Sequence, residues 1–162
     1  MLPIGSSTSQ IDNVLITSKA IFVIEAKNYK GRIFGSIHQD QWTMTSKPTK
    51  TYKNKRGKTY QKSYVNKYQF YNPIKQNKTH IKAIQQNIQT QIPMYNLVVF
   101  GPKADLSKLK GELKNITINT IHLNRFIKSE HESNENSMTY KDLDKIKDTL
   151  LLRSKEKLLK CV

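Results

Sequence analysis

The fold is decided by two neighbouring stretches, Gln10-Ile-Asp-Asn-Val-Leu-Ile-Thr17 and Ala20-Ile-Phe-Val-Ile-Glu-Ala-Lys27. Both are rich in β-branched residues, and Ser18-Lys19 supplies a turn between them, so they predict a β-hairpin. Apolar residues run without a break from Ile21 to Ile24, which indicates a strand covered on both faces. We therefore expect the second strand in the middle of a sheet that has helices packed against it.

Charged side chains interrupt these otherwise apolar strands. Glu25 and Lys27 are two residues apart, so they project from the same face of their strand. By the same rule, Gln10 and Asp12 share a face of the first strand. If the two strands pair, Asp12 lies near Glu25, with the Lys27 ammonium beside both carboxylates. Buried charges without partners are costly, and a hard divalent cation is a natural partner for this group.

Magnesium suits such a site, because it binds few protein carboxylates and keeps waters and substrate phosphate oxygens in its shell. The spacing predicts Asp12, Glu25 and the main-chain carbonyl of Ala26 as its ligands. Lys27 would then orient or help to deprotonate the attacking water and stabilise charge on the phosphate. The alternative is structural: Glu25 and Lys27 lie at the solvated end of an edge strand and pair with each other.

Further elements follow along the chain. The opening nine residues are small and polar and predict a loop. The residue patterns predict four more strands, at 32–38, 41–45, 96–100 and 116–121. The lysine-rich stretch 46–67 has almost no aliphatic residues and predicts a long loop or an irregular hairpin.

Helix signals lie after the strands. Asn72-Pro73 is typical of a helix start, and an apolar stripe carries that helix to about residue 90. Residues 123–128 predict a helical turn, and the polar residues 129–137 predict a mobile linker. Thr139-Tyr-Lys-Asp142 resembles a capping box that opens a final helix. That helix is expected to turn inward Leu143, Ile146, Leu150 and Leu158. This order of elements predicts an α/β or α+β fold.

Length and composition exclude several classes of protein. A chain of 162 residues is expected to form one domain. The single cysteine, Cys161, excludes an intramolecular disulfide and a cysteine-based zinc site. No run approaches the roughly 18 apolar residues of a membrane span, and no signal-peptide pattern opens the chain. We therefore expect a cytoplasmic protein without a membrane partner.

The net charge of +16 is concentrated in the middle of the chain. Residues 41–104 carry twelve Lys and Arg, no Asp or Glu, and six of the eight tyrosines. Basic density with aromatic rings favours a nucleic acid as partner, and the alternative is a lysine-rich composition that serves only solvation. The residues expected to neutralise phosphates are Lys47, Lys50, Lys53, Lys55, Arg56, Lys58, Lys62, Lys67, Lys75 and Lys78.

Several separated motifs occur in order: Gln10-Ile-Asp12, the segment from Ile21 to Gly35, Trp42, and Asn72-Pro73-Ile-Lys-Gln76-Asn77. Over about residues 9–101, this ordered set of motifs closely resembles the nuclease-related domain (NERD) family of the PD-(D/E)xK endonuclease-like superfamily. The resemblance implies a restriction-endonuclease-like mixed central sheet flanked by helices. It also implies a nuclease centre at Asp12, Glu25 and Lys27 that Gln76 faces; otherwise Gln76 is an ordinary solvent-facing glutamine.

One departure from the family affects the expected domain. Members usually carry a helix with a Gly-Glu pair and a first strand before the Gln-Ile-Asp motif, and only nine residues precede Gln10 here. We therefore expect an N-terminally truncated version of the fold, in which another element or another chain covers one sheet face. The expected organisation is a nuclease-related domain over 1–128 with a basic insertion at 46–67, a linker at 129–138 and a helix at 139–162.

The sequence thus leads to a Mg²⁺- or Mn²⁺-dependent nuclease that binds DNA and hydrolyses phosphodiester bonds. One alternative is a catalytically impaired nucleic-acid-binding remnant of the same fold. Another is a partner-docking fragment whose interface is formed by the final helix and by the place of the missing N-terminal helix. The four histidines show no metal-ligand spacing and receive no role, although His80, one turn after Gln76, is the one to watch.

Overall fold

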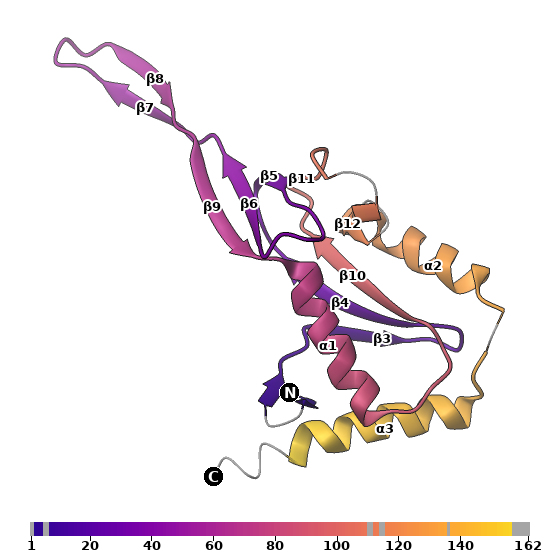
Figure 1. Cartoon of the computed structure of the whole chain (residues 1–162). Coiled ribbons are helices and arrows are strands. Elements are labelled where there is room, and N and C mark those ends of the chain that lie inside the picture. Colours follow the sequence, from indigo (N-terminus) through magenta and orange to yellow (C-terminus); the bar gives the residue numbers. More distant parts are fainter. Residues whose placement is uncertain (1, 5–6, 110–111, 114–115, 136, 157–162) are drawn as a thin grey trace.

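The computed structural model of the chain describes residues 2–4, 7–109, 112–113, 116–135 and 137–156 (Figure 1). Leu158 and Cys161, which the sequence analysis singled out, lie outside the described residues. In chain order the elements are β1 (Leu2–Ile4), β2 (Ser7–Ser9), β3 (Asn13–Ile16), β4 (Ile21–Lys27), β5 (Gly31–Phe34), β6 (Gln41–Ser46), β7 (Thr49–Lys53), β8 (Thr59–Ser63), β9 (Asn66–Tyr71), α1 (Pro73–Asn87), β10 (Met94–Phe100), β11 (Ala104–Asp105), β12 (Thr117–Asn119), the 3₁₀ turn η2 (Thr120–His122), α2 (Leu123–Ser133) and α3 (Tyr140–Glu156).

The central sheet has the strand order β12-β10-β4-β3. β3 and β4 form the expected antiparallel hairpin, with Asn13 opposite Ile24. β10 runs parallel to β4 on its other side, and β12 runs parallel to β10. The sheet is therefore mixed, β4 lies inside it, and the fold is mixed α+β, in agreement with a restriction-endonuclease-like architecture.

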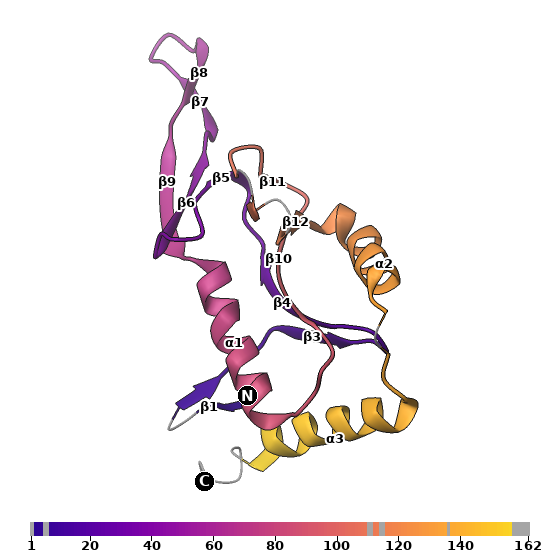
Figure 2. The ribbon, with the colours of Figure 1, turned by 45° about the vertical axis from the view of Figure 1, so that its right-hand side comes forward.

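Both faces of β4 are covered within the chain (Figures 1 and 2). Because side chains alternate along a strand, Ile21 and Val23 pack on one face with Ala83 and Ile84 of α1. On the other face, Phe22 and Ile24 pack against the side of α2 that carries its apolar residues, Leu123, Phe126 and Ile127. The sequence left open whether an element or another chain covers the second face, and α2 covers it over β4 and β10. Leu15 of the edge strand β3 stays 36% exposed.

The opening residues are not the loop that the sequence predicted. β1 and β2 pair as an antiparallel hairpin, and Leu2 is only 6% exposed. Leu2 joins the same apolar cluster as Ile84 of α1 and Ile146 of α3. The prediction was wrong because packing against these helices, rather than the polar composition of the segment, determines its structure.

A second sheet, β11-β5-β6-β9, packs its inner face around Trp42. The Trp42 ring is fully buried, lies parallel to that of Phe100 at 6.5 Å between centroids, and donates from Nε1 to the Ser36 carbonyl. A Cβ atom on Gly35 would lie 2.3 Å from this ring. The close approach ends β5 at Phe34, four residues before the end of the predicted strand.

The helices correct one further expectation. α2 extends to Ser133, so the predicted helical turn at 123–128 and the first half of the predicted linker form one helix. Apolar packing of its first turns, and an i,i+4 contact of 3.8 Å between Lys128 and Glu132, continue the helix into the polar segment. The capping box is confirmed, since the amide of Thr139 donates to Asp142 Oδ2 at 3.2 Å. No described helix is long and apolar enough to span a membrane.

Residues 46–67, here called the arm, are mostly an extended hairpin. β7 and β8 pair with each other in a two-stranded sheet of their own, and β6 and β9 continue from its base into the second sheet. Figures 1 and 2 show the arm projecting away from the helices. The irregular-hairpin prediction therefore holds for residues 49–63, whereas β9 was not expected.

Candidate functional site

The candidate site lies at the carboxyl end of β4, where the first turns of α1 approach the sheet. Glu25 is the last buried residue of β4, with 1% of its surface exposed. Its Oε1 accepts a hydrogen bond from Lys27 Nζ at 2.5 Å, and its Oε2 lies 3.2 Å from His80 Nε2. Lys27 Nζ also donates to Gln76 Oε1 at 3.2 Å. Four side chains from β4 and α1 thus form one hydrogen-bonded group, here called the Glu25 cluster.

This arrangement decides between two placements of Glu25. The structural alternative put Glu25 and Lys27 at the solvated end of an edge strand. β4 instead lies between β3 and β10, and Glu25 is almost fully buried, so that placement is wrong. The two side chains do pair with each other, as the period of two along a strand requires.

Asn72 sets the position of α1. Its Oδ1 caps the helix by accepting from the amides of Ile74 and Lys75, and Pro73 occupies the first helical position. Its Nδ2 donates to the carbonyls of three residues between β5 and β6, namely Ser36, Ile37 and Gln39. The side chain therefore ties the start of the helix to the loop between β5 and β6.

The face of α1 toward the sheet carries the polar residues of the cluster. Gln76 and His80 are four residues apart and so lie on one side of the helix. Asn77, fully buried, donates from Nδ2 to the Val23 carbonyl at 2.6 Å and to Asn96 Oδ1 at 2.9 Å. These bonds fix the helix against both β4 and β10, which places Gln76 beside Lys27 and His80 beside Glu25.

Glu25 is held in its ionised form. Burial raises the pKa of Glu25, but the hydrogen bonds from His80 and Lys27, together with their charges, outweigh it and leave the pKa below its ordinary value of 4.5. An ionised carboxylate only accepts hydrogen bonds, so His80 donates from Nε2. Glu25 is therefore a buried negative charge that Lys27 and His80 contact from two sides.

Asp12 lies next to this group but is exposed. Its Oδ2 accepts from the main-chain amide of Ala26 at 3.1 Å, so the carboxylate contacts the residue that follows Glu25. Within the described part of the chain, no group of three or more His, Cys, Asp or Glu side chains is placed to hold a metal ion. The structure therefore brings two carboxylates to neighbouring backbone positions, and among the described residues they do not form part of a larger acidic or histidine group placed for a metal.

The donor set at this place suits a hard divalent cation. Carboxylate and carbonyl oxygens are the ligands that Mg²⁺ prefers, and it commonly takes only one or two protein carboxylates. An ionised carboxylate can accept at about four positions, and the contacts of Glu25 with Lys27 and His80 use two of them. Asp12, Glu25 and the Ala26 carbonyl are thus chemically compatible with a Mg²⁺ or Mn²⁺ ion that keeps most of its shell for water and phosphate.

Sequence reasoning singled out His80, one helical turn beyond Gln76, but gave it no role, and the structure places it in the Glu25 cluster. Sequence reasoning missed Tyr29, which had a usable signal because it follows Lys27 by two residues. Burial raises the pKa of Tyr29, and so do its hydrogen bond with Tyr68 and the charge of Glu25. The Tyr29 ring packs 4.5 Å from that of Phe70, which brings β9 close to the cluster.

The predicted phosphate-binding residues separate into two groups. Lys78 on α1 is exposed. The eight cations of the arm are also all exposed: Lys47, Lys50, Lys53, Lys55, Arg56, Lys58, Lys62 and Lys67. Lys75 differs, because its Nζ contacts Asp40 Oδ1 at 2.5 Å and donates to the His38 carbonyl at 2.8 Å. Lys75 thus fastens α1 to the loop before β6 and is less available for a phosphate.

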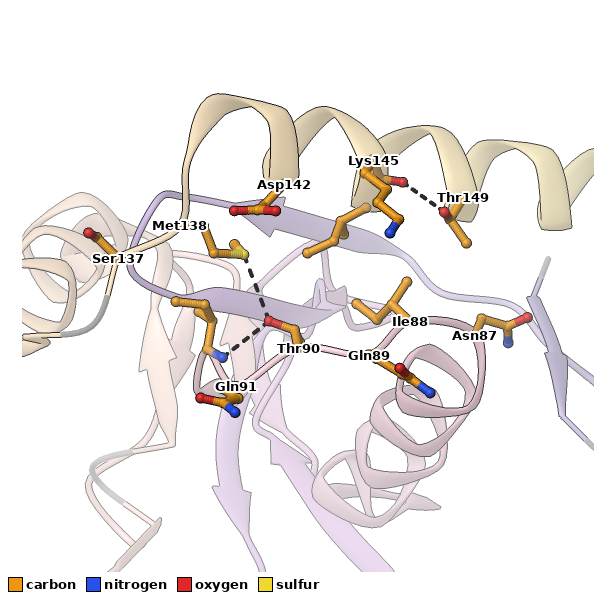
Figure 3. Close-up of a pocket in the computed structure, with 12 residues that line it drawn as sticks. Asn87, Ile88, Gln89, Thr90, Gln91, Ser137, Met138, Asp142, Lys145 and Thr149 are labelled. Carbon is orange, nitrogen blue, oxygen red and sulfur yellow. Dashed lines mark hydrogen bonds between the residues drawn. The ribbon is translucent and has the colours of Figure 1, made fainter.

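A separate hollow of about 520 Å³ lies between the end of α1 and α3 (Figure 3). Its lining includes Gln89, Thr90, Met138 and Lys145, and Thr90 Oγ1 lies 3.7 Å from Met138 Sδ. None of the predicted catalytic residues lines it. The hollow is therefore not part of the Glu25 cluster.

Comparison with known proteins shows the family to which this chain belongs. The nuclease-related domain family matches residues 2–101, and the chain belongs to that family. An uncharacterized protein of Bacillus anthracis is 35% identical over 107 residues, which is 66% of this chain and 42% of that protein. The chain thus spans about two fifths of the length of this curated relative. No solved structure gives a significant match.

Proposed function

We propose that this chain is a divalent-metal-dependent nuclease domain that hydrolyses phosphodiester bonds in DNA. The observation that carries the proposal is the Glu25 cluster: a buried, ionised Glu25 bonded to Lys27, on a central strand, with Asp12 bonded to the next residue. Membership of the nuclease-related domain family supports the same reaction class. A buried carboxylate whose pKa is shifted by a specific charged partner is a common feature of catalytic sites.

In this proposal Asp12, Glu25 and the Ala26 carbonyl hold Mg²⁺ or Mn²⁺, which supplies a Lewis acid for the phosphate. The Lys27 ammonium orients the attacking water and stabilises the negative charge that develops on the phosphate oxygens. Gln76 holds Lys27 Nζ through its Oε1, and His80 holds Glu25 through Oε2. Gln76 and His80 are thus positioning residues that keep the Lys27 and Glu25 side chains in place.

The test uses supercoiled and linear DNA with the full chain, in Mg²⁺, in Mn²⁺ and in EDTA. Glu25→Gln and Lys27→Met remove the two charges with little change in side-chain size, and Lys141→Met on the exposed side of α3 is the matched control. We expect both site variants to lose cleavage by at least roughly 100-fold, and EDTA to abolish it in the wild type. DNA affinity, measured by fluorescence anisotropy in EDTA, should be nearly unchanged in all three variants.

Two results would contradict the proposal. If Glu25→Gln and Lys27→Met both cut DNA at the wild-type rate, the Glu25 cluster is not the catalytic centre. If the wild type binds DNA but cuts in neither metal, the protein is not a nuclease under these conditions and the second candidate function gains support.

The second candidate is nucleic-acid binding without cleavage. It is favoured by a specific observation: the described residues contain no three-membered group of acidic or histidine side chains placed for a metal, while the eight cations of the arm are all exposed. Binding that persists in EDTA and shows a strong salt dependence is expected for both candidates. Metal-dependent cleavage separates them.

A further inference from the structure

The arm differs in construction from the rest of the molecule. β7 and β8 pair over five residues each, from Thr49 opposite Ser63 to Lys53 opposite Thr59, and they pair with no other described strand. A turn closes the hairpin, with Asn54 Oδ1 accepting from the amides of Arg56 and Lys58. Figures 1 and 2 show this two-stranded ribbon standing free at the end of the second sheet.

The charge of the arm is uncompensated. Its 22 residues carry eight Lys and Arg and no Asp or Glu, and no described carboxylate forms an ion pair with any of them. Lys50 lies directly opposite Lys62 in the ladder. Like charges directly opposite each other destabilise an antiparallel pair, so the ribbon is arranged at some cost to its own stability. A polyanion bound along this face would remove that repulsion.

The tyrosine side chains of the arm contact one another. The Tyr52 and Tyr60 rings stack at 5.6 Å between centroids with 22° between their planes. The Tyr52 and Tyr64 hydroxyls lie 2.9 Å apart, and Lys62 Nζ lies 5.4 Å from the centroid of the Tyr64 ring. A two-stranded hairpin in water is marginally stable, and these contacts stiffen it. The sequence analysis counted these aromatic rings in favour of a nucleic acid partner, whereas Tyr52 and Tyr64 form contacts within the arm.

We propose that the arm is a preformed β-ribbon that binds double-stranded DNA through the major groove and its flanking phosphates. The inference deepens the proposed function, on which its choice of a DNA partner rests. The major groove of B-DNA, about 12 Å wide, admits a two-stranded β-ribbon. The corresponding groove of an RNA duplex is deep and narrow, and single strands are usually held by aromatic rings that are free to stack.

The size of the ribbon agrees with such a site. Five residues of antiparallel strand span about 17 Å at about 3.4 Å per residue. Duplex DNA carries one phosphate per about 1.7 Å of helix axis, so this length faces about ten phosphates. Six of the eight cations lie on these two strands and their turn, and Lys47 and Lys67 lie at the base of the ribbon. The cations of the arm therefore match much of the charge within reach.

The test measures binding of the full chain in EDTA, so that no cleavage is involved. The probes are a 20-base-pair DNA duplex, one of its single strands, and an RNA duplex of the same sequence, titrated by fluorescence anisotropy between about 50 and 200 mM salt. The arm variant is Lys50→Gln/Lys62→Gln. The control variant is Lys128→Gln/Lys141→Gln, which removes the same net charge from exposed positions on α2 and α3.

We expect the wild type to prefer duplex DNA over both other probes. The arm variant should lose at least roughly 10-fold in affinity for duplex DNA at 100 mM salt, and its salt slope should fall by about 1.8, or about 0.9 for each lost phosphate contact. The control variant should lose less than about 2-fold. Equal losses in both variants would mean that only net charge matters, and tighter binding to the single strand or the RNA duplex would overturn the duplex assignment.

Tyr60→Ala tests the alternative of base stacking, because Tyr60 is the arm tyrosine with the largest exposed ring, at 52%. The proposal expects Tyr60→Ala to leave the ratio of duplex to single-strand affinity unchanged, since the groove and phosphate contacts come from the lysines. A selective loss of single-strand binding from a wild type that prefers single strands would overturn it. A failure of the proposed nuclease activity would show separately, as wild-type duplex binding in EDTA without cleavage in Mg²⁺.

Discussion

Lysine side chains differ in burial and in bonding between two regions of this molecule, the Glu25 cluster and the arm. Lys27 has 18% of its side chain exposed and binds both Glu25 and Gln76. Lys50 is exposed, faces another lysine and has no described carboxylate partner. A buried charge needs a partner inside the protein, because desolvation is costly, whereas an exposed charge remains available to a partner from outside. Burial therefore distinguishes a lysine that is bonded within the Glu25 cluster from one that remains available to an external partner.

The largest expected effect compares aromatic side chains of the arm with those of the core beneath the second sheet. Trp42→Ala should lower the free energy of unfolding by about 3–5 kcal/mol, because the ring is fully buried against Phe100 and Gly35. Tyr60→Ala on the arm should cost less than about 1 kcal/mol, since its ring is half exposed and stacks on Tyr52 alone among the described rings. Urea unfolding followed by far-UV circular dichroism measures both, and equal costs would mean that the arm belongs to the main core.

A smaller effect is expected from removing one charge at each place. Lys27→Met removes one of the two side-chain partners of the buried Glu25 and leaves His80. The variant should lower the free energy of unfolding by on the order of 2–3 kcal/mol. Lys50→Met should be neutral or slightly stabilising, because it removes the repulsion with Lys62. Urea midpoints compare the two variants directly. A Lys27→Met protein as stable as the wild type would show that Glu25 does not need this partner.

The Glu25–Lys27 pair makes a pH-dependent contribution to stability, and its sign follows from the pKa of Glu25. The pKa of Glu25 is lower in the folded protein than its ordinary value of 4.5. The unfolded chain therefore binds the proton first as the pH falls, and the stabilisation, fully present above 4.5, is lost as the pH falls through the folded pKa. Glu25→Gln should show a flatter decline of unfolding free energy below pH 4.5 than the wild type. Parallel curves would contradict this assignment.

Replacing either of two asparagines by aspartate compares a buried helix cap with an exposed turn, and we expect the buried change to cost about 1–2 kcal/mol of unfolding free energy. Asn72 is fully buried and uses both ends of its amide, accepting from the start of α1 and donating to three carbonyls. Asn72→Asp keeps the cap but loses the donated bonds and places a carboxylate against those carbonyls, so it should destabilise the protein. Asn54→Asp in the exposed turn of the arm only has to accept, and should change stability by less than about 0.5 kcal/mol. Similar costs would mean that the donated bonds of Asn72 are unimportant.

The smallest global effect is expected at the tip of the arm. Gly57 has φ +77°, a conformation that costs a residue with a Cβ atom about 1 kcal/mol. Gly57→Ala should therefore loosen the turn and disturb the Tyr52–Tyr60 contact, while the urea midpoint stays within error of the wild type. NMR chemical shifts confined to residues 49–63 would support this, and shifts in the Trp42 core would show that the arm and the body are coupled.

The sequence alone determined the elements whose signals are local. The β3–β4 hairpin, the central place of β4, the start of α1 at Asn72-Pro73 and the common face of Glu25 and Lys27 all follow from spacing over a few residues. The motif order also led to the nuclease-related domain family. These features were predictable because side-chain alternation and helix capping depend on the backbone near each residue.

Only the tertiary structure decided which distant residues meet. His80 contacts Glu25 across 55 positions, and Lys75 is drawn to Asp40 instead of remaining free like the lysines of the arm. Leu2 brings the opening segment into the core, against the polar composition around it. Such contacts arise from the packing of α1 on the sheet and from the burial that results, and neither is encoded in local spacing. Burial then determines which charges must be neutralised within the protein and which remain available to an external partner.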